Sequence, residues 1–206
     1  MRHSHFTLAL TSLFTLAVSS RQNPRSDGDL DPLEPWQVTR LNTFSPSGRS
    51  NDSTLAYIWA NITNPNSIPA GPGASFDSSS ANCTVDWTFF GEDPYGRVFE
   101  CETAETQPGS SSSGSSSVSK WTIEIIDAND TMSSPTENMD VKFTLTTNLT
   151  MNGDDYYKVL IGTQHFEVGD NMEGQCGGSG VCSWGLKDEI IPVLVQPTIA
   201  ACKGTC

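Results

Sequence analysis

The sequence is poor in histidine and in basic residues, and it has no long apolar run after its first twenty residues. It contains 11 Lys and Arg against 24 Asp and Glu, which gives a formal charge of −13. Because a field of that sign repels phosphates, nucleic acid and anionic membrane surfaces are disfavoured as partners. No stretch of about 18 apolar residues follows, so we expect no membrane span.

The scarcity of histidine also limits the catalytic chemistry that we expect. A serine or cysteine nucleophile needs a base, and His165 is the one histidine beyond residue 5, in GTQHFEVGD without a Gly-x-Ser-x-Gly motif nearby. We expect it to be a surface residue. Paired carboxylates remain open for a glycosidase, and loops or strand ends supply these acids: Asp127, Asp130, Asp154, Asp155 and Glu167.

Metal and cofactor sites are not expected either. No Cys-x-x-Cys spacing occurs, and a zinc site would have only one histidine available beyond the N-terminus. The segment starting at Asp127 begins like a calcium loop but lacks the glycine at its sixth position and the spaced Glu. We therefore predict a protein that is not an enzyme and holds no cofactor.

The N-terminus has the pattern of a secretory signal peptide. Residues 1–20 combine Arg2, an apolar run from Phe6 to Val18 and small residues suited to cleavage. Removing them takes away one basic residue, so the formal charge moves from −13 to −14. We predict secretion to an extracellular location.

Composition divides the rest of the chain. Residues 21–35 are polar and rich in Pro and Asp, which predicts a disordered leader, and the Ser-rich residues 106–119 predict an insertion loop. Between and after them we expect one β domain, residues 36–198, followed by a cysteine-containing tail, residues 199–206.

Short runs with period-two alternation predict strands throughout that domain. In residues 141–150, Val141, Phe143, Leu145 and Leu149 share one face. Trp121, Ile123 and Ile125 repeat the pattern, and so do Ile191, Val193 and Val195, where Pro192 favours an edge or a strand start. The sequence NGDD at residues 152–155 predicts a hairpin turn. The fold class is therefore all-β, a single compact antiparallel β-barrel or β-sandwich.

Six cysteines in a secreted chain predict disulfides that staple this fold. We expect residues 83–87 to pair antiparallel with residues 97–101 around the loop GEDPYG, which sets Cys83 opposite Cys101. Cys176 and Cys182 would clip the loop GGSGV, and Cys202 and Cys206 would then pair by elimination. Other connectivities stay open, including a bond from the C-terminal cysteines to another chain.

Five Asn-x-Ser/Thr triplets mark potential N-glycosylation sites: Asn51, Asn61, Asn82, Asn129 and Asn148. Asn148 has the outward parity of its strand, as a glycan requires. Asn82 adjoins Cys83, where disulfide formation would compete with glycan transfer. We expect some of the five to be used.

The run LAYIWANI leaves two interpretations. Tyr57, Trp59 and Asn61 share one face, so a glycan on Asn61 would place both rings in solvent, as a possible ligand surface. Alternatively, Asn61 lies beyond the strand end and Trp59 belongs to the core. We favour the core, since Trp is highly buried on average.

Several stretches resemble the small secreted fungal proteins related to the Alternaria major allergen. The resemblance rests on PWQVTRLNTFSPSGR, AYIWANITNPN, VDW followed by FEC, and CGGSGVCSWGLKDEIIPVLV, with matching positions at Trp36, Cys83, Cys101, Cys176, Cys182, Gly185, Asp188 and residues 191–195. It covers most of residues 36–195. Three features depart from that family: the Ser-rich insertion, Cys202 with Cys206, and the lack of a cysteine between Arg21 and Asn82.

The resemblance implies a β-barrel or sandwich secreted by an ascomycete fungus, without a catalytic site, acting as elicitor, effector or allergen in virulence. It also implies a plant defence protein or small phenolic as partner. We predict a non-enzymatic effector-like protein that binds a host or cell-surface partner in the apoplast. The alternatives are a carbohydrate-active β-sandwich, either a sugar-binding module or a paired-acid glycosidase, and a structural cell-wall glycoprotein. The oligomeric state is not predicted.

Overall fold

The computed structural model describes residues 32–50, 53–104, 116–128 and 134–206. The unit that contains the described sheets runs from Leu33 to Cys206. The expected signal peptide and the leader up to residue 31 lie outside the described residues. No helix in the described ranges has the length and apolarity needed to cross a membrane.

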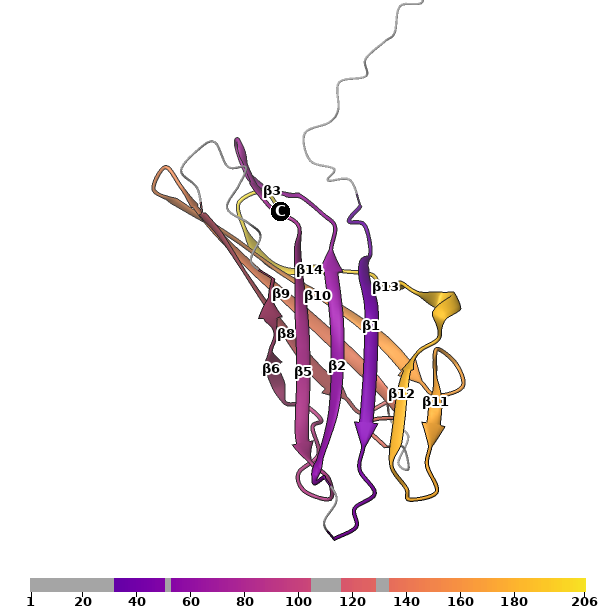
Figure 1. Cartoon of the computed structure of the whole chain (residues 1–206). Helices are drawn as coiled ribbons and strands as arrows, with labels where there is room; N and C mark the ends of the chain where they lie inside the picture. Colours follow the sequence, from indigo (N-terminus) through magenta and orange to yellow (C-terminus); the bar gives the residue numbers. More distant parts are fainter. Residues whose placement is uncertain (1–31, 51–52, 105–115, 129–133) are drawn as a thin grey trace, which may run out of the picture. The chain divides into compact units, whose positions relative to one another are not determined.

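Two antiparallel sheets make up most of this unit (Figure 1). The first sheet has the order β11-β12-β1-β2-β5-β7, and β13 also pairs with β1. Its strands are β1 (Trp36–Ser45), β2 (Leu55–Asn64), β5 (Ser79–Thr88), β7 (Glu102–Thr103), β11 (Met172–Cys176), β12 (Cys182–Leu186) and β13 (Val193–Val195).

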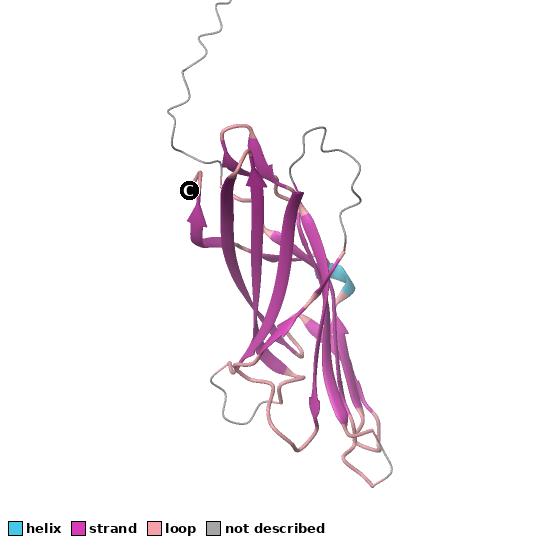
Figure 2. Cartoon of the chain, turned by 90° about the vertical axis from the view of Figure 1, so that its left-hand side faces the viewer, coloured by secondary structure: helices cyan, strands magenta, loops and turns pink. Residues whose placement is uncertain are grey.

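The second sheet has the order β14-β10-β9-β8-β6. Its strands are β6 (Val98–Glu100), β8 (Ser116–Ile126), β9 (Asn138–Met151), β10 (Asp154–Glu167) and β14 (Thr198–Lys203). A small hairpin, β3 (Ile68–Gly71) with β4 (Ala74–Phe76), forms a separate two-stranded sheet. Figure 2 shows the strands in magenta and the one-turn helix η1 (Asp188–Ile190) in cyan.

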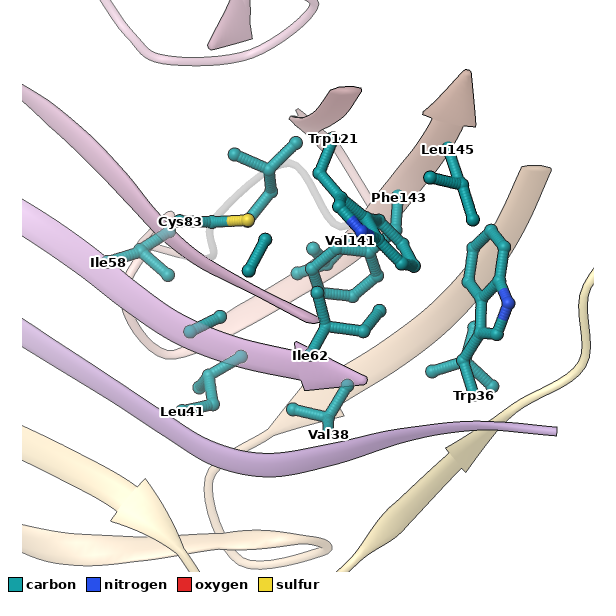
Figure 3. Close-up of a cluster of buried hydrophobic side chains, with 14 of the residues drawn as sticks. Trp36, Val38, Leu41, Ile58, Ile62, Cys83, Trp121, Val141, Phe143 and Leu145 are labelled. Carbon is teal, nitrogen blue, oxygen red and sulfur yellow. The ribbon is translucent and has the colours of Figure 1, made fainter. Parts of the chain in front are cut away.

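The two sheets bury their inner faces against each other, as the predicted alternation requires. Figure 3 shows side chains of β1, β2 and β5 turned toward those of β8 and β9. Trp36 and Trp121 meet edge-to-face at 4.7 Å between ring centroids, and both are fully buried. The all-β, disulfide-stapled fold is therefore confirmed, as a sandwich-like pair of sheets and not as a closed barrel.

Several local predictions are confirmed. Val141, Phe143, Leu145 and Leu149 are all buried, with Asn148 exposed between them. Asn152 and Gly153 form the two-residue turn between β9 and β10, both with positive φ, as a type I′ hairpin needs. Val193 and Val195 are buried in β13, but Ile191 is exposed and lies outside it: the strand begins after Pro192, whose missing N–H therefore costs no ladder bond.

The predicted hairpin around GEDPYG is wrong, although its disulfide forms. Cys83 lies in β5 of the first sheet, whereas β6 pairs with β8 in the second sheet. The chain changes sheets at Cys101: its N–H bonds to the carbonyl of Trp121, and the next residues, Glu102 and Thr103, pair with β5. The Cys83–Cys101 bond therefore ties the two sheets together at this crossing, with 4.2 Å between Cα atoms.

Three predicted boundaries also need correction. The C-terminal tail is a strand, since β14 pairs with β10 from Thr198 to Lys203. The Cys202–Cys206 disulfide closes its end, and Cys176–Cys182 closes the turn from β11 to β12. Residues 116–119 of the expected loop begin β8. Residues 33–35 of the expected leader are ordered: Leu33 packs on the core and Glu34 bonds with Asn66.

Candidate binding face of the first sheet

Tyr57 and Trp59 lie on the outer face of the first sheet, so the interpretation of Trp59 as a core residue is wrong. In β2, Ala56, Ile58, Ala60 and Ile62 fill the core, while Tyr57 is 40% exposed and Trp59 is half-buried. Asn61 is part of the strand and shares their face. The inner positions carry the smaller aliphatic side chains, and Ile58 and Ala60 lie beside Val85 and Cys83 of β5.

Strand register arranges this outer face in rows. One row runs from Gln175 of β11 to Asp86 of β5, and the next runs from Glu173 of β11 to Thr84 of β5. The first row contains Gln175, Ser183, Phe44, Tyr57 and Asp86. The second contains Glu173, Gly185, Asn42, Trp59 and Thr84. We call these ten residues the aromatic face.

Neighbouring side chains hold both rings in place. Phe44 stacks on Tyr57 with 5.2 Å between centroids and 17° between planes. The guanidinium of Arg40 lies 4.7 Å from the centre of the Trp59 ring, a cation–π contact. Arg40 Nε also donates to Asn42 Oδ1 at 2.8 Å. The rings are therefore positioned before any partner binds, which lowers the entropy cost of binding.

A hollow of about 510 Å³ opens over β11 and β12, and it reaches Asn42, the register partner of Trp59. Its lining residues are Asn42, Glu173, Gly174, Gln175, Ser183, Trp184 and Gly185. Gly185 lies between Glu173 and Asn42 in the register, and a Cβ there would come 3.0 Å from Asn42 Nδ2. The missing side chain keeps the hollow open between amide and carboxylate groups. A ligand could thus meet an aromatic ring and hydrogen-bonding groups together.

A second hollow, of about 280 Å³, lies at the end of β2. Its lining residues are Thr63, Asn64, Pro65, Ser78, Ser79, Ser80 and Ala104. Ser79 Oγ is already engaged, because it accepts a bond from the buried indole of Trp121 at 3.1 Å. This hollow contains hydroxyl and amide groups without an exposed ring or a charge.

The acids predicted for a glycosidase do not form one constellation. Asp154 and Asp155 begin β10 and Glu167 ends it, a separation of roughly 40 Å at strand rise. Glycosidase carboxylates lie about 5 to 10 Å apart. Asp155 instead accepts from Thr150 at 2.7 Å. Asp130 lies outside the described residues.

Asp127 contributes to the raised pKa of Tyr95. Burial, and then the charges of Asp127 and Asp93, raise the pKa of Tyr95 to about 12. A phenol with that pKa stays protonated at neutral pH, so it does not serve as a base.

His165 is a surface residue, as predicted, but it does not lack partners. Its Nδ1 lies 2.8 Å from Asp140 and its Nε2 lies 3.5 Å from Glu167. Burial lowers the pKa of His165, but the hydrogen bonds and charges of Asp140 and Glu167 outweigh it and raise the pKa above 6.5. Only Glu167 is near in sequence; Asp140 comes from the adjacent strand β9, and the register of the Asn152–Gly153 hairpin sets it opposite His165.

In the described part of the chain, one group of an acid and two cysteines has its potential ligand atoms close enough together to hold a metal ion. Ligand atoms of Glu137, Cys176 and Cys182 lie within 4.8 Å of one another. Both sulfurs are bonded to each other, however, so neither offers a thiolate. This group does not fit a metal.

The predicted glycosylation sites divide by location. Asn148 is exposed on the second sheet, as its parity predicted. Asn61 and Asn82 lie opposite each other on the first sheet, half-buried and exposed respectively. Asn51 and Asn129 fall outside the described residues.

Sequence reasoning missed most of the aromatic face. Phe44 and Asn42 alternate with buried Thr43 and Leu41 in β1, which is a readable signal. Arg40 was not readable, because a register irregularity between Val38 and Arg40 shifts it onto the outer face. Glu173 and Gln175 reach the face through β12, a non-sequential neighbour of β1.

Comparisons with known proteins identify no relative. No family model matches the chain, no curated protein matches it, and no solved structure matches it.

Proposed function

We propose that the protein is a secreted, non-enzymatic binding protein of the effector or elicitor type, and that it engages an extracellular partner through the aromatic face. The observation that carries this proposal is the outward, pre-positioned pair Tyr57 and Trp59, held by Phe44 and Arg40. Exposed aromatic rings clustered beside polar groups are typical of interaction sites.

Charge supports a polar or cationic partner over an anionic one. Asp86 and Glu173 end the two rows on exposed positions, and the whole chain is strongly acidic. None of the ten residues of the aromatic face is a cation, and the guanidinium of the neighbouring Arg40 is engaged with Trp59 and Asn42. Phosphate-rich partners are therefore disfavoured.

Glycan binding is a second candidate function, favoured by the hollow that Asn42 lines, since Asn42 lies opposite Trp59 in the register. A sugar ring could lie on the indole while its hydroxyls bond to Asn42, Glu173 or Gln175. Such an arrangement binds without catalysis, so it belongs to the sugar-binding alternative and not to the glycosidase.

The test uses a matched pair of tyrosines. Tyr57 is 40% exposed on the first sheet and Tyr157 is 38% exposed on the second. We expect the double variant Tyr57→Ala with Trp59→Ala to reduce the response of infiltrated leaves at least tenfold. Tyr157→Ala should leave the response unchanged. Equal loss in both variants, or none in either, would contradict the proposal.

A glycan array probed with the same three proteins separates the two candidates. Binding of wild type and of Tyr157→Ala to defined glycans, lost in Tyr57→Ala with Trp59→Ala, supports the glycan function. A leaf response that depends on the two rings without glycan binding supports a protein or phenolic partner.

A further inference from the structure

Two potential glycosylation sites lie directly opposite each other on the first sheet. Asn61 of β2 and Asn82 of β5 are register partners and point to the same outer face. Thr63 and Thr84 complete their triplets. Asn61 Nδ2 donates to Asn82 Oδ1 at 2.8 Å, so the two amides form one hydrogen-bonded pair.

The two amides differ in how much of each is engaged. Asn61 uses both ends of its amide, because its Oδ1 also accepts from Thr39 Oγ1 at 2.6 Å. It is half-buried between β1 and β5, opposite Arg40. Asn82 is exposed and uses only its oxygen; its Nδ2 has no hydrogen-bond partner in the described part of the chain.

Space allows one sugar at this pair. Opposite residues of an antiparallel pair have Cβ atoms about 5 Å apart. Two sugar rings attached to residues this close would compete for the same surface. In the folded chain Cys83 does not obstruct a glycan on Asn82, since its side chain is fully buried on the inner face while Asn82 points outward.

We propose that the pair carries one N-linked glycan, on Asn82. In the transfer, Asn82 Nδ2 forms a bond to the anomeric carbon of a lipid-diphosphate-linked oligosaccharide. The bond from that carbon to the diphosphate oxygen breaks, the lipid diphosphate leaves, and the amide nitrogen loses one proton. A glycan on Asn61 would replace one hydrogen of the Nδ2 that donates to Asn82 and would have to leave a half-buried position between β1 and β5, so folded secreted protein is depleted of it.

The glycan on Asn82 borders the aromatic face. Asn82 lies two residues before Thr84, the register partner of Trp59. Tyr57 lies four residues from Asn61 along β2, and the hollow lies toward β11 and β12. The proposal does not depend on what this face binds.

The experiment is site mapping on the full chain secreted from a eukaryotic host. Enzymatic release of N-glycans in ¹⁸O-water converts each occupied Asn to labelled Asp, which peptide mass spectrometry locates. We expect label at Asn82 and none at Asn61. Label at Asn61, at both residues of one molecule, or at neither would overturn the proposal.

Two threonine variants give an independent check, because they remove each triplet while keeping both amides. We expect Thr84→Ala to lower the intact mass by one glycan and Thr63→Ala to leave the mass of its glycans unchanged. A shift in Thr63→Ala, or none in Thr84→Ala, would contradict the assignment. Asn82→Gln repeats the test if Thr84→Ala is not secreted.

Discussion

The outer faces of the two sheets follow the same alternation but differ in chemistry. On the second sheet, charged groups pair across strands, Lys142 with Glu124 and His165 with Asp140, and Glu167 of the same strand also faces His165. On the first sheet, Arg40 contacts the Trp59 ring and forms no ion pair with a carboxylate of the described residues. A face whose charged groups are already paired has few groups left to bind a partner. Ordered aromatic rings beside amide groups can bind one.

The inner faces differ as well. The first sheet contributes mainly apolar side chains to the core, but the second contributes Lys158, which is fully buried. Its Nζ has no hydrogen-bond partner in the described ranges. Burial lowers the pKa of Lys158.

The largest effect should come from uncoupling the sheets. Cys83→Ala with Cys101→Ala removes the bond at the sheet crossing and should lower the free energy of unfolding by about 3 kcal/mol, by the loop-closure estimate. Urea denaturation measures it. The Cys202–Cys206 bond closes a shorter loop, so Cys202→Ala with Cys206→Ala should lower the free energy of unfolding by about 2 kcal/mol. A larger loss in this control would mean that the C-terminal strand, and not the crossing, holds the sheets together.

Lys158→Met should make the second inner face resemble the first. Replacing an unpartnered buried amine by an apolar side chain of similar length should raise the free energy of unfolding by about 1 to 3 kcal/mol. Because the folded pKa is lowered, the unfolded chain binds more protons between that pKa and 10.5, so wild-type stability rises with pH in this window.

Urea denaturation across pH 7 to 10 checks the lysine prediction, and the variant should lack this part of the slope. Lys142→Met, on the outer face, serves as its control. Destabilisation by Lys158→Met would show that the amine has a partner.

Arg40→Gln should sharpen the contrast between the outer faces. Losing the cation–π contact should cost about 0.5 to 1 kcal/mol of stability and weaken partner binding several-fold, because Trp59 loses its support. Arg97→Gln is a matched control, since Arg97 lies 5.0 Å from the Phe99 ring, which belongs to the second sheet. It should cost similar stability without changing binding. If both variants weaken binding equally, the aromatic face is not special.

The smallest effect concerns His165. Its raised pKa contributes stability that is fully present below 6.5 and is lost as pH rises through the folded pKa. Because the histidine side chain is 40% exposed, we expect less than about 1 kcal/mol. Thermal unfolding between pH 5 and 8 should show this loss in wild type and not in His165→Gln. The same slope in both would assign it to another group.

The sequence by itself determined the local order of this protein. Alternation marked the buried residues of β8 and β9, the Asn152–Gly153 pair fixed a hairpin, and proximity in the chain gave the Cys176–Cys182 bond. These features depend on neighbouring residues and on backbone preferences, which the sequence carries directly.

Only the tertiary structure decided which faces are covered and which strands are neighbours. Alternation gives β2 two faces, one aliphatic and one aromatic. The burial of Ile58 and Ala60 beside Val85 and Cys83 decides that the face with Trp59 is the outer one. Likewise, the sheet change at Cys101 depends on strand pairing. Such pairings are set by the packing of residues far apart in the chain. A period-two pattern shows which residues share a face but not which strand pairs with it.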